Sequence, residues 1–328
     1  MKKKIKEITA LVLSLAVVVG VCYYLPYKLM PPKYDYGSLW NMYTEEPEDS
    51  IDVLFIGSSL VYCDIIPAAI YEDTEVTSYL LTGGGLNSAL GYYYLKEGLR
   101  TQSPDLVMIE ATSAFFKKQV SYSKPNIGYM PYGLNRVGAT LTTAESSERF
   151  GLLFPLYNYH ELWQESSWST VISPRADKRT DIHAGYTYIT DIVPQPERVP
   201  RGVAEKEDIE FNLGYLKKTV ELCREKGIEV ELFLSPSCYY IADKYKAMLT
   251  EALPDVSFVD YSDHAEDMGL DMSVDYCGKI HLNFYGADKF SHYLARHIIS
   301  DFDISDREHS VELWQQRTDI YNTYVADE

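Results

Sequence analysis

The chain has 328 residues, enough for one large α/β domain with an insertion or for two small domains. Its formal net charge of −18 argues against nucleic acid as a partner, because contacts to phosphates need a basic surface. The same charge disfavours electrostatic docking on an anionic membrane face. The five cysteines form no CxxC pair, so we expect no zinc site, and no other motif calls for a metal or a cofactor.

The N-terminus predicts a membrane anchor. Four lysines precede an uncharged apolar run from Ile8 to Leu25, which is long enough to span a bilayer. Lysines on the N-terminal side of such a run keep that end in the cytoplasm, so the rest of the chain would face outward. A cleaved signal peptide is the alternative, but no clear small-x-small cleavage site follows the run. Residues 1–25 are therefore expected to be a cytoplasmic stub and a retained single-pass anchor in the cell membrane.

Residues 26–50 are expected to form a stalk. They contain four prolines and the acidic stretch Glu45-Glu46-Pro47-Glu48-Asp49, a composition typical of an extended linker. The folded domain should then cover residues 51–302. The remaining residues, 303–328, are expected to form a peripheral C-terminal helix or tail.

The domain alternates apolar runs with amphipathic stretches, which predicts a doubly wound parallel sheet of the flavodoxin-like kind. Helices are expected after Asn87, from Glu205 to Gly227, over about 239–252, and from Asn283 to about 300. The five expected strands cover 52–56, 76–81, 106–109, 229–234 and 256–259.

The alternation stops between about 111 and 204. This segment is rich in proline, tyrosine and tryptophan, Trp163 among them, and its aromatic content argues against disorder. We interpret it as one long insertion over the carboxyl edge of the sheet, acting as a lid. Its aromatic rings suit stacking on sugars and suit protein interfaces equally well.

Two short motifs bear the chemistry. Gly57-Ser58-Ser59 follows the first strand, where a strand–turn–helix corner presents a hydroxyl at the carboxyl edge of the sheet. On its own this signal is weak, since such residues also cap helices or cradle phosphates. His281, before the closing helix, is the best candidate base, because the fold returns its loop to the same edge. Serine and histidine would then meet as nucleophile and base.

These motifs resemble those of the SGNH/GDSL hydrolase superfamily, in the membrane-anchored branch that includes D-alanyl-transfer and polysaccharide O-acetylation proteins. The resemblance covers about 51–110 and 205–300. It implies that Ser59, the third residue of its block, is the nucleophile. It also implies that the glycine block Thr82-Gly83-Gly84-Gly85 supplies an oxyanion-hole N–H, most plausibly from Gly85. These glycines also fit a simple turn before a helix, and such a turn is compatible with the oxyanion-hole role.

The chain departs from the family pattern in two places. The third block usually ends in an asparagine that donates to the oxyanion, whereas the chain has Glu110-Ala111-Thr112-Ser113. The fifth block usually has an aspartate three residues before the histidine, where this chain has Gly278. The nearest upstream acid is Asp275, which is either the residue that orients His281 or an acid that caps a loop. A backbone carbonyl could orient the ring instead.

Two functions follow from these features. The first is an outward-facing serine esterase or acyltransferase, in which Ser59 attacks, His281 moves the proton, and Gly85 and Ser59 N–H groups hold the oxyanion. The resemblance implies acetyl or D-alanyl esters of a cell-surface polysaccharide or teichoic-acid-like polymer as substrates. The second is a degenerate member without catalysis, which binds a glycan or docks with a membrane-bound O-acyltransferase.

Overall fold

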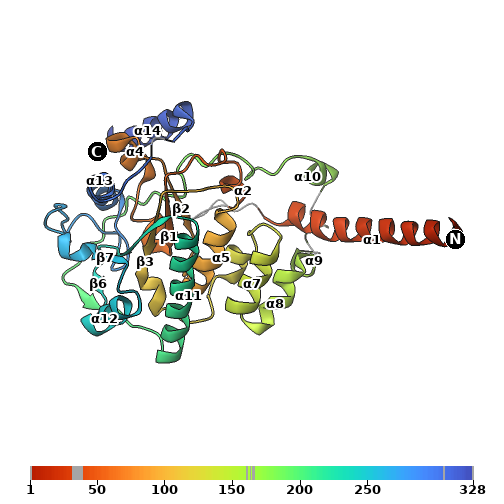
Figure 1. The fold of residues 1–328 in the computed structure, drawn as a ribbon. Coiled ribbons are helices and arrows are strands. Elements are labelled where there is room, and N and C mark those ends of the chain that lie inside the picture. Colours follow the sequence, from red (N-terminus) through yellow and green to blue (C-terminus); the bar gives the residue numbers. More distant parts are fainter. Residues whose placement is uncertain are drawn as a thin grey trace.

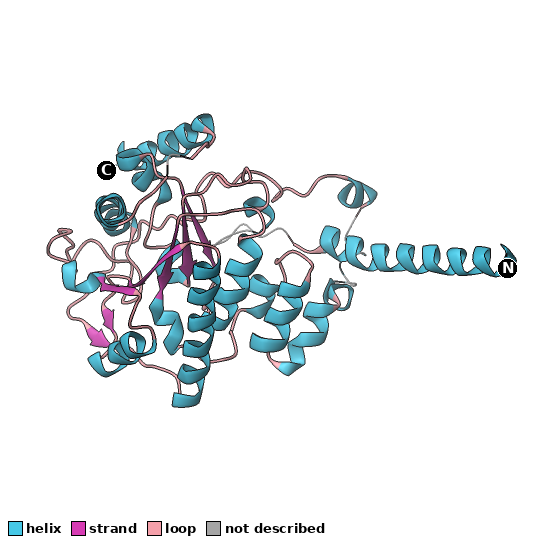
Figure 2. Ribbon diagram, in the orientation of Figure 1, coloured by secondary structure: helices cyan, strands magenta, loops and turns pink. Residues whose placement is uncertain are grey.

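A computed structural model describes residues 2–31, 40–159, 162, 164, 167–305 and 307–326. It contains a five-stranded, wholly parallel sheet with the order β2-β1-β3-β5-β7, which confirms the flavodoxin-like prediction (Figure 2). Each expected strand is present within a few residues of its expected bounds. The strands are β1 (Val53–Gly57), β2 (Ser78–Thr82), β3 (Leu106–Glu110), β5 (Glu229–Leu234) and β7 (Ser257–Asp260). A small separate pair joins β4 (Val199–Pro200) and β6 (Tyr239–Tyr240).

Helices cover both faces of the sheet (Figure 1). The core on one face includes apolar side chains of α5 (Ser88–Gly98), α11 (Lys206–Glu225) and α12 (Asp243–Ala252). The core on the other face includes side chains of α3 (Ser59–Tyr62), α4 (Pro67–Thr74), α13 (Phe284–Asp301) and α14 (Val311–Ala326). The strands β1, β2 and β3 are buried along their whole length, which explains their largely apolar sequence.

The insertion combines short helices with a long irregular stretch. It runs from the 3₁₀ helix η1 (Ala111–Phe115) through a set of short helices to a long irregular stretch before β4. The expected aromatic residue Trp163 lies outside the described residues. The helices are α6 (Ser123–Ile127), α7 (Leu134–Thr143), α8 (Ser146–Leu153), α9 (Pro155–Tyr159) and α10 (Trp168–Ile172).

The N-terminal helix α1 spans Lys2–Leu29 and projects from the body (Figure 1). It is long and apolar enough to cross a bilayer, and the rest of the chain covers none of its most apolar window. The helix continues four residues beyond the expected end of the anchor, from Pro26 to Leu29. The side chains of Pro26 and Leu29 are buried.

The segment 40–50 does not behave as a free stalk. It contains the short helix α2 (Trp40–Tyr43), and Trp40 and Tyr43 are buried in the core beside Tyr94 and Tyr79. The composition of residues 26–50 suggested a linker, but these two large aromatic side chains pack α2 against the domain.

The C-terminal helix is also less peripheral than expected. The Trp314 ring of α14 stacks on Tyr71 with ring centroids 4.8 Å apart. The buried Arg317 guanidinium forms an ion pair with the buried Glu46 carboxylate at 2.5 Å. Helix α14 therefore packs against both the domain and the segment that was expected to be a stalk.

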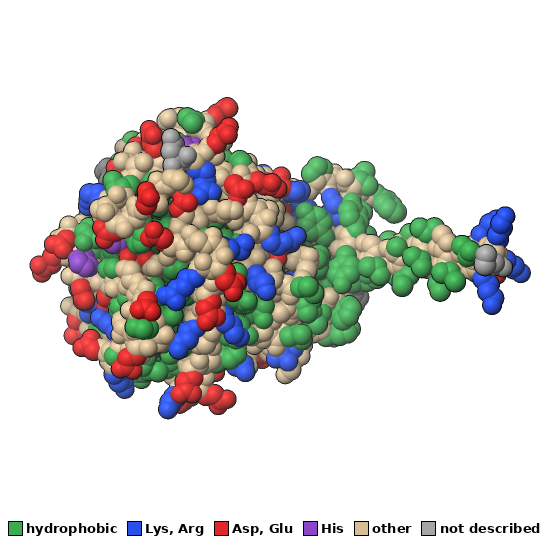
Figure 3. All heavy atoms as spheres, in the orientation of Figure 1, with side chains coloured by type: hydrophobic (Ala, Val, Ile, Leu, Met, Phe, Trp, Pro, Cys, Tyr) green, Lys and Arg blue, Asp and Glu red, His purple; other side chains and the backbone are tan. Residues whose placement is uncertain are grey.

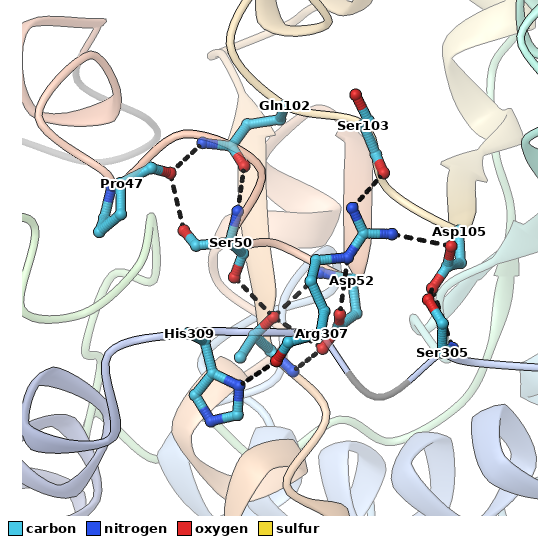
Figure 4. Close-up of polar contacts among 10 residues, drawn as sticks. Pro47, Ser50, Asp52, Gln102, Ser103, Asp105, Ser305, Arg307 and His309 are labelled. Carbon is cyan, nitrogen blue, oxygen red and sulfur yellow. Dashed lines mark hydrogen bonds and ion pairs between the residues drawn. The ribbon is translucent and has the colours of Figure 1, made fainter.

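Arg307 lies at the amino ends of the strands and forms several polar contacts there (Figure 4). Its guanidinium contacts Asp105 Oδ1 at 2.8 Å and Asp52 Oδ1 at 3.2 Å, and it donates to the carbonyl of Ser103. Asp52 in turn accepts hydrogen bonds from the backbone N–H and the hydroxyl of Thr77, both at 2.8 Å. These contacts tie the C-terminal segment to the starts of β1, β2 and β3, at the opposite edge from the candidate site.

Candidate active site at the carboxyl edge of the sheet

Ser59 lies at the start of α3, directly after β1 ends at Gly57. Ser58 is the N-cap of this one-turn helix, and its hydroxyl accepts the N–H of Leu60 at 3.4 Å. The turn needs a glycine, since a Cβ at Gly57 would lie 2.5 Å from Val61 Cγ2 and 2.8 Å from Glu110 Cβ. The local sequence thus accounts for the tight corner that brings the Ser59 hydroxyl to the edge of the sheet.

The acid at this edge is Asp64, five residues after Ser59. Its side chain is fully buried, and its Oδ2 accepts the hydroxyl of Ser235 at 3.0 Å. Its Oδ1 accepts the backbone N–H of Leu282 at 3.0 Å. Burial raises the pKa of Asp64 well above its usual value, and the hydrogen bonds from Ser235 and Leu282 partly offset that rise. Asp64 therefore connects the segment after Ser59 to the loop that carries His281.

His281 Nδ1 faces this acid, 3.8 Å from Asp64 Oδ1, which is a contact longer than a hydrogen bond. The loop is held by an isolated antiparallel bridge between Tyr276 and Leu282. Nδ1 itself is buried without a hydrogen-bond partner, while the side chain remains 22% exposed. Burial, followed by the positive charge of Arg201, lowers the pKa of His281 to about 4. The imidazole is therefore neutral at pH 7, as a general base must be.

Asp275 does not take the orienting position. Its Oδ2 accepts Lys289 Nζ at 2.7 Å and the backbone N–H of Asp271 at 2.6 Å. Its backbone carbonyl accepts the N–H of Asn283 at 3.0 Å. No hydrogen bond or ion pair joins Asp275 to His281 in the described chain, so its environment is that of a loop-capping acid. Of the two roles left open for Asp275, these contacts match the loop-capping one, and the acid that lies near the imidazole is Asp64.

Gly85 adopts φ +59°, in the left-handed region that favours glycine. The side-chain amide of Asn126, on α6 of the insertion, donates to the carbonyl of Gly84 at 2.8 Å. Across a trans peptide the N–H of the next residue points away from that carbonyl, so Asn126 also sets the direction of the Gly85 N–H. Among the described residues, the N–H groups of Ser59 and Gly85 have no hydrogen-bond acceptor. Both are therefore available to a ligand.

A cavity of about 350 Å³ includes Gly85, Lys117 and Arg201 among its lining residues. Arg201 follows β4 and lies over the rings of Phe116 and Tyr239, at 5.3 and 5.8 Å from their centroids. One terminal nitrogen of its guanidinium is buried and has no hydrogen-bond partner. The cavity therefore presents positive charge beside the glycine loop and within electrostatic reach of His281.

Glu110 ends β3 where the family pattern would lead to an asparagine. Its Oε1 accepts the N–H of Thr112 at 3.1 Å, and its buried Oε2 has no partner. Burial raises the pKa of Glu110 to about 7, against the lowering effects of Thr112 and Arg201. Thr112 and Ser113 are also buried, and the Ser113 hydroxyl donates to the Glu110 carbonyl.

No cluster of three or more metal-ligating side chains occurs among the residues that the structure describes. The cysteines in the described part of the chain form no disulfide bond. The structure thus places Ser59 and Gly85 in the segments that follow β1 and β2 and holds the His281 loop against Asp64, while Asp275 binds Lys289 instead. Sequence reasoning missed Asp64, Asn126 and Arg201. Only Asp64 had a usable signal, as the first acidic residue after the Gly57-Ser58-Ser59 block.

Comparisons with known proteins give matches of fold alone. No protein-family model and no curated protein matches the chain. One similar crystal structure is a candidate acylhydrolase from Bacteroides fragilis, at 14% identity and a TM-score of 0.36, covering 82% of this chain and 99% of that one. Another is a GDSL-like lipase from Bacteroides thetaiotaomicron, at 12% identity and a TM-score of 0.32, covering 76% of this chain and 87% of that one.

Proposed function

We propose that this chain is a membrane-anchored serine esterase or acyltransferase that acts on acyl esters outside the cytoplasm. The observation that carries the proposal is the buried Asp64 carboxylate, which binds the loop of His281 through Leu282 N–H and contacts the imidazole. In a Ser–His–Asp unit the acid faces Nδ1 of the histidine and the serine faces Nε2, and Asp64 lies on the Nδ1 side of His281 as this arrangement requires.

The proposed reaction has two steps, acylation of Ser59 and release of the acyl group. Ser59 Oγ attacks the ester carbonyl while the free nitrogen of His281, Nε2, takes the hydroxyl proton. The N–H groups of Ser59 and Gly85 hold the oxyanion. When it collapses, the ester C–O bond breaks and the departing alkoxide takes the proton from His281, leaving acyl-Ser59. A water or a second alcohol then attacks the acyl-enzyme with His281 again as base, which gives hydrolysis or transfer respectively.

The charge of the cavity supports an anionic, ester-bearing polymer as substrate. Lys117 and Arg201 line it together with Gly85, and none of its described lining residues is acidic. Arginine and lysine recognise phosphate and carboxylate groups, so a teichoic-acid-like or acidic polysaccharide chain fits this chemistry. The acyl group in this proposal is acetyl or D-alanyl. The helix α1 holds the enzyme at the membrane with its lysine-rich end in the cytoplasm.

A serine-reactive fluorophosphonate probe tests the proposal on the full chain in detergent or nanodiscs. We expect covalent labelling of the wild type and none of Ser59→Ala. Ser58→Ala is the matched control, since it removes the neighbouring hydroxyl and a helix cap but keeps the nucleophile. Absence of labelling in the folded wild type would favour the non-catalytic glycan-binding or acyltransferase-docking function instead. Equal labelling of Ser59→Ala would show that Ser59 is not the nucleophile.

A further inference from the structure

Several large apolar side chains of the insertion are exposed around the base of α1 (Figure 3). Trp168 and Ile172 of α10 are 84% and 74% exposed. Three more are Phe150 of α8, Phe154 at the C-terminal cap of α8, and Tyr157 of α9, which are 57%, 54% and 63% exposed. We call Phe150, Phe154, Tyr157, Trp168 and Ile172 the apolar collar. Soluble domains rarely gather so many large apolar side chains on one exposed surface without a partner.

The position of the collar relative to α1 is set by specific contacts. The Arg175 guanidinium donates to the carbonyls of Tyr27 and Met30, at 2.5 and 2.7 Å, and forms a buried ion pair with Asp177 at 2.6 Å. The Tyr24 hydroxyl donates to the carbonyl of Val171 at 2.9 Å. The last turns of α1 are therefore attached to the segment that carries α10.

The collar lies beside a part of α1 that a bilayer would cover. A cavity of about 710 Å³ separates Val18, Val19 and Cys22 of α1 from Phe150, Phe154 and Tyr157 of the collar. If the apolar run ends at Leu25 near the membrane boundary, residues 18–22 lie roughly 5–10 Å below it at about 1.5 Å per residue. Interfacial amphipathic helices bury their apolar faces to about the same depth.

We propose that the apolar collar inserts into the outer leaflet, with lipid acyl chains filling the cavity beside α1. The body then rests on the bilayer. The occupant is lipid because the surface is continuous with a helix that itself requires a lipid environment. This inference rests on the retained-anchor part of the proposed function and is independent of the catalytic part. It also ties the membrane to the insertion that carries Asn126 at the glycine loop.

Spin labels on the full chain test this, in nanodiscs of phosphatidylcholine and phosphatidylglycerol with one protein per disc. Labels are placed through Phe154→Cys and Trp168→Cys, and signal from the native cysteines is subtracted with the unsubstituted chain. Ile299→Cys on α13 is the matched control, because Ile299 is as exposed as Phe154, at 54%. Val12→Cys reports on the anchor itself.

We expect the labels at 154, 168 and 12 to be relaxed by oxygen and protected from a water-soluble nickel chelate, at least several-fold relative to the label at 299. Protection at 12 with full nickel access at 154 and 168 would overturn the collar proposal and leave the anchor in place. Nickel access at 12 would overturn both. Fluorophosphonate labelling of Ser59 in the same discs reports separately on the catalytic proposal.

Discussion

Asp64 Oδ1 lies 3.8 Å from His281 Nδ1 and at the same time accepts the N–H of Leu282 at 3.0 Å. One buried oxygen thus contacts both the imidazole and the backbone beside it. Catalytic contacts are often long in the absence of substrate and tighten when it binds. In the proposed mechanism, this relationship makes Asp64, rather than Asp275, the residue that positions His281.

Replacing Asp64 should impair turnover without unfolding the protein. We expect Asp64→Asn to lower kcat by about 10²- to 10⁴-fold, because the amide supports the wrong imidazole tautomer and stabilises no imidazolium. The melting temperature should stay close to that of the wild type. Burial raises the pKa of Asp64 because it disfavours the charged carboxylate, and the amide has the same shape without that charge. Asp275→Asn is the matched control and should keep most of kcat while weakening the pairing with Lys289. Comparable losses of kcat in both variants would contradict the assignment.

Ser59 and His281 should behave as one catalytic unit. We expect Ser59→Ala and His281→Ala each to abolish ester turnover above background. The double variant should lose little more, because members of one unit are not additive. Steady-state rates with an activated acyl ester measure this. Losses that multiply across the two substitutions would show that the residues act independently.

Asn126 should affect the rate more than substrate binding. Without its hydrogen bond to the Gly84 carbonyl, the Gly85 N–H is free to turn away from the oxyanion. We expect Asn126→Ala to lower kcat about 10- to 100-fold, less than the 10²- to 10³-fold typical for loss of a direct donor, with little change in KM. Asn135→Ala on α7 is the control, since it also loses one side-chain hydrogen bond, to Glu97 at 2.7 Å. Equal effects of the two variants on kcat would point to a general effect on the insertion.

The pH dependence of kcat/KM should report the charge of Arg201. With the pKa of His281 near 4, the base stays neutral down to that pH, so activity on an uncharged ester should fall only below about pH 4. In Arg201→Gln the nearby positive charge is gone, which makes the imidazole easier to protonate. The acid limb should then move to higher pH, and discrimination in favour of anionic esters should shrink. An unmoved acid limb would show that Arg201 does not act on His281.

Glu110 should make the fold less stable as pH rises. Its folded pKa of about 7 lies above the ordinary 4.5, so the folded state holds the proton more tightly than the unfolded chain. The stability contributed by the protonated form is complete below about pH 4.5 and is lost as pH rises through 7, by roughly 3 kcal/mol at most. We expect Glu110→Gln to raise the unfolding free energy at pH 8 and to change it little at pH 4. Denaturant titrations at the two pH values measure the difference.

The sequence by itself determined the sheet, because buried parallel strands read as short continuous apolar runs and their helices as spaced apolar stripes. It also indicated the apolar N-terminal helix and the positions of Ser59, Gly85 and His281 at strand ends or before a helix. These features depend on neighbours in the chain, so local patterns are enough to find them.

Tertiary structure decided which side chains meet. Asp275 is closer in sequence to His281, yet its carboxylate binds Lys289, while Asp64 reaches the histidine loop from 217 residues away in the chain. Asn126 contacts the glycine loop from an insertion with no periodic pattern, and Trp40 and Trp314 turn an expected stalk and tail into packed segments. Such pairings depend on which distant surfaces bury one another. The energy of that burial is shared across the whole fold and leaves no local signature in the sequence.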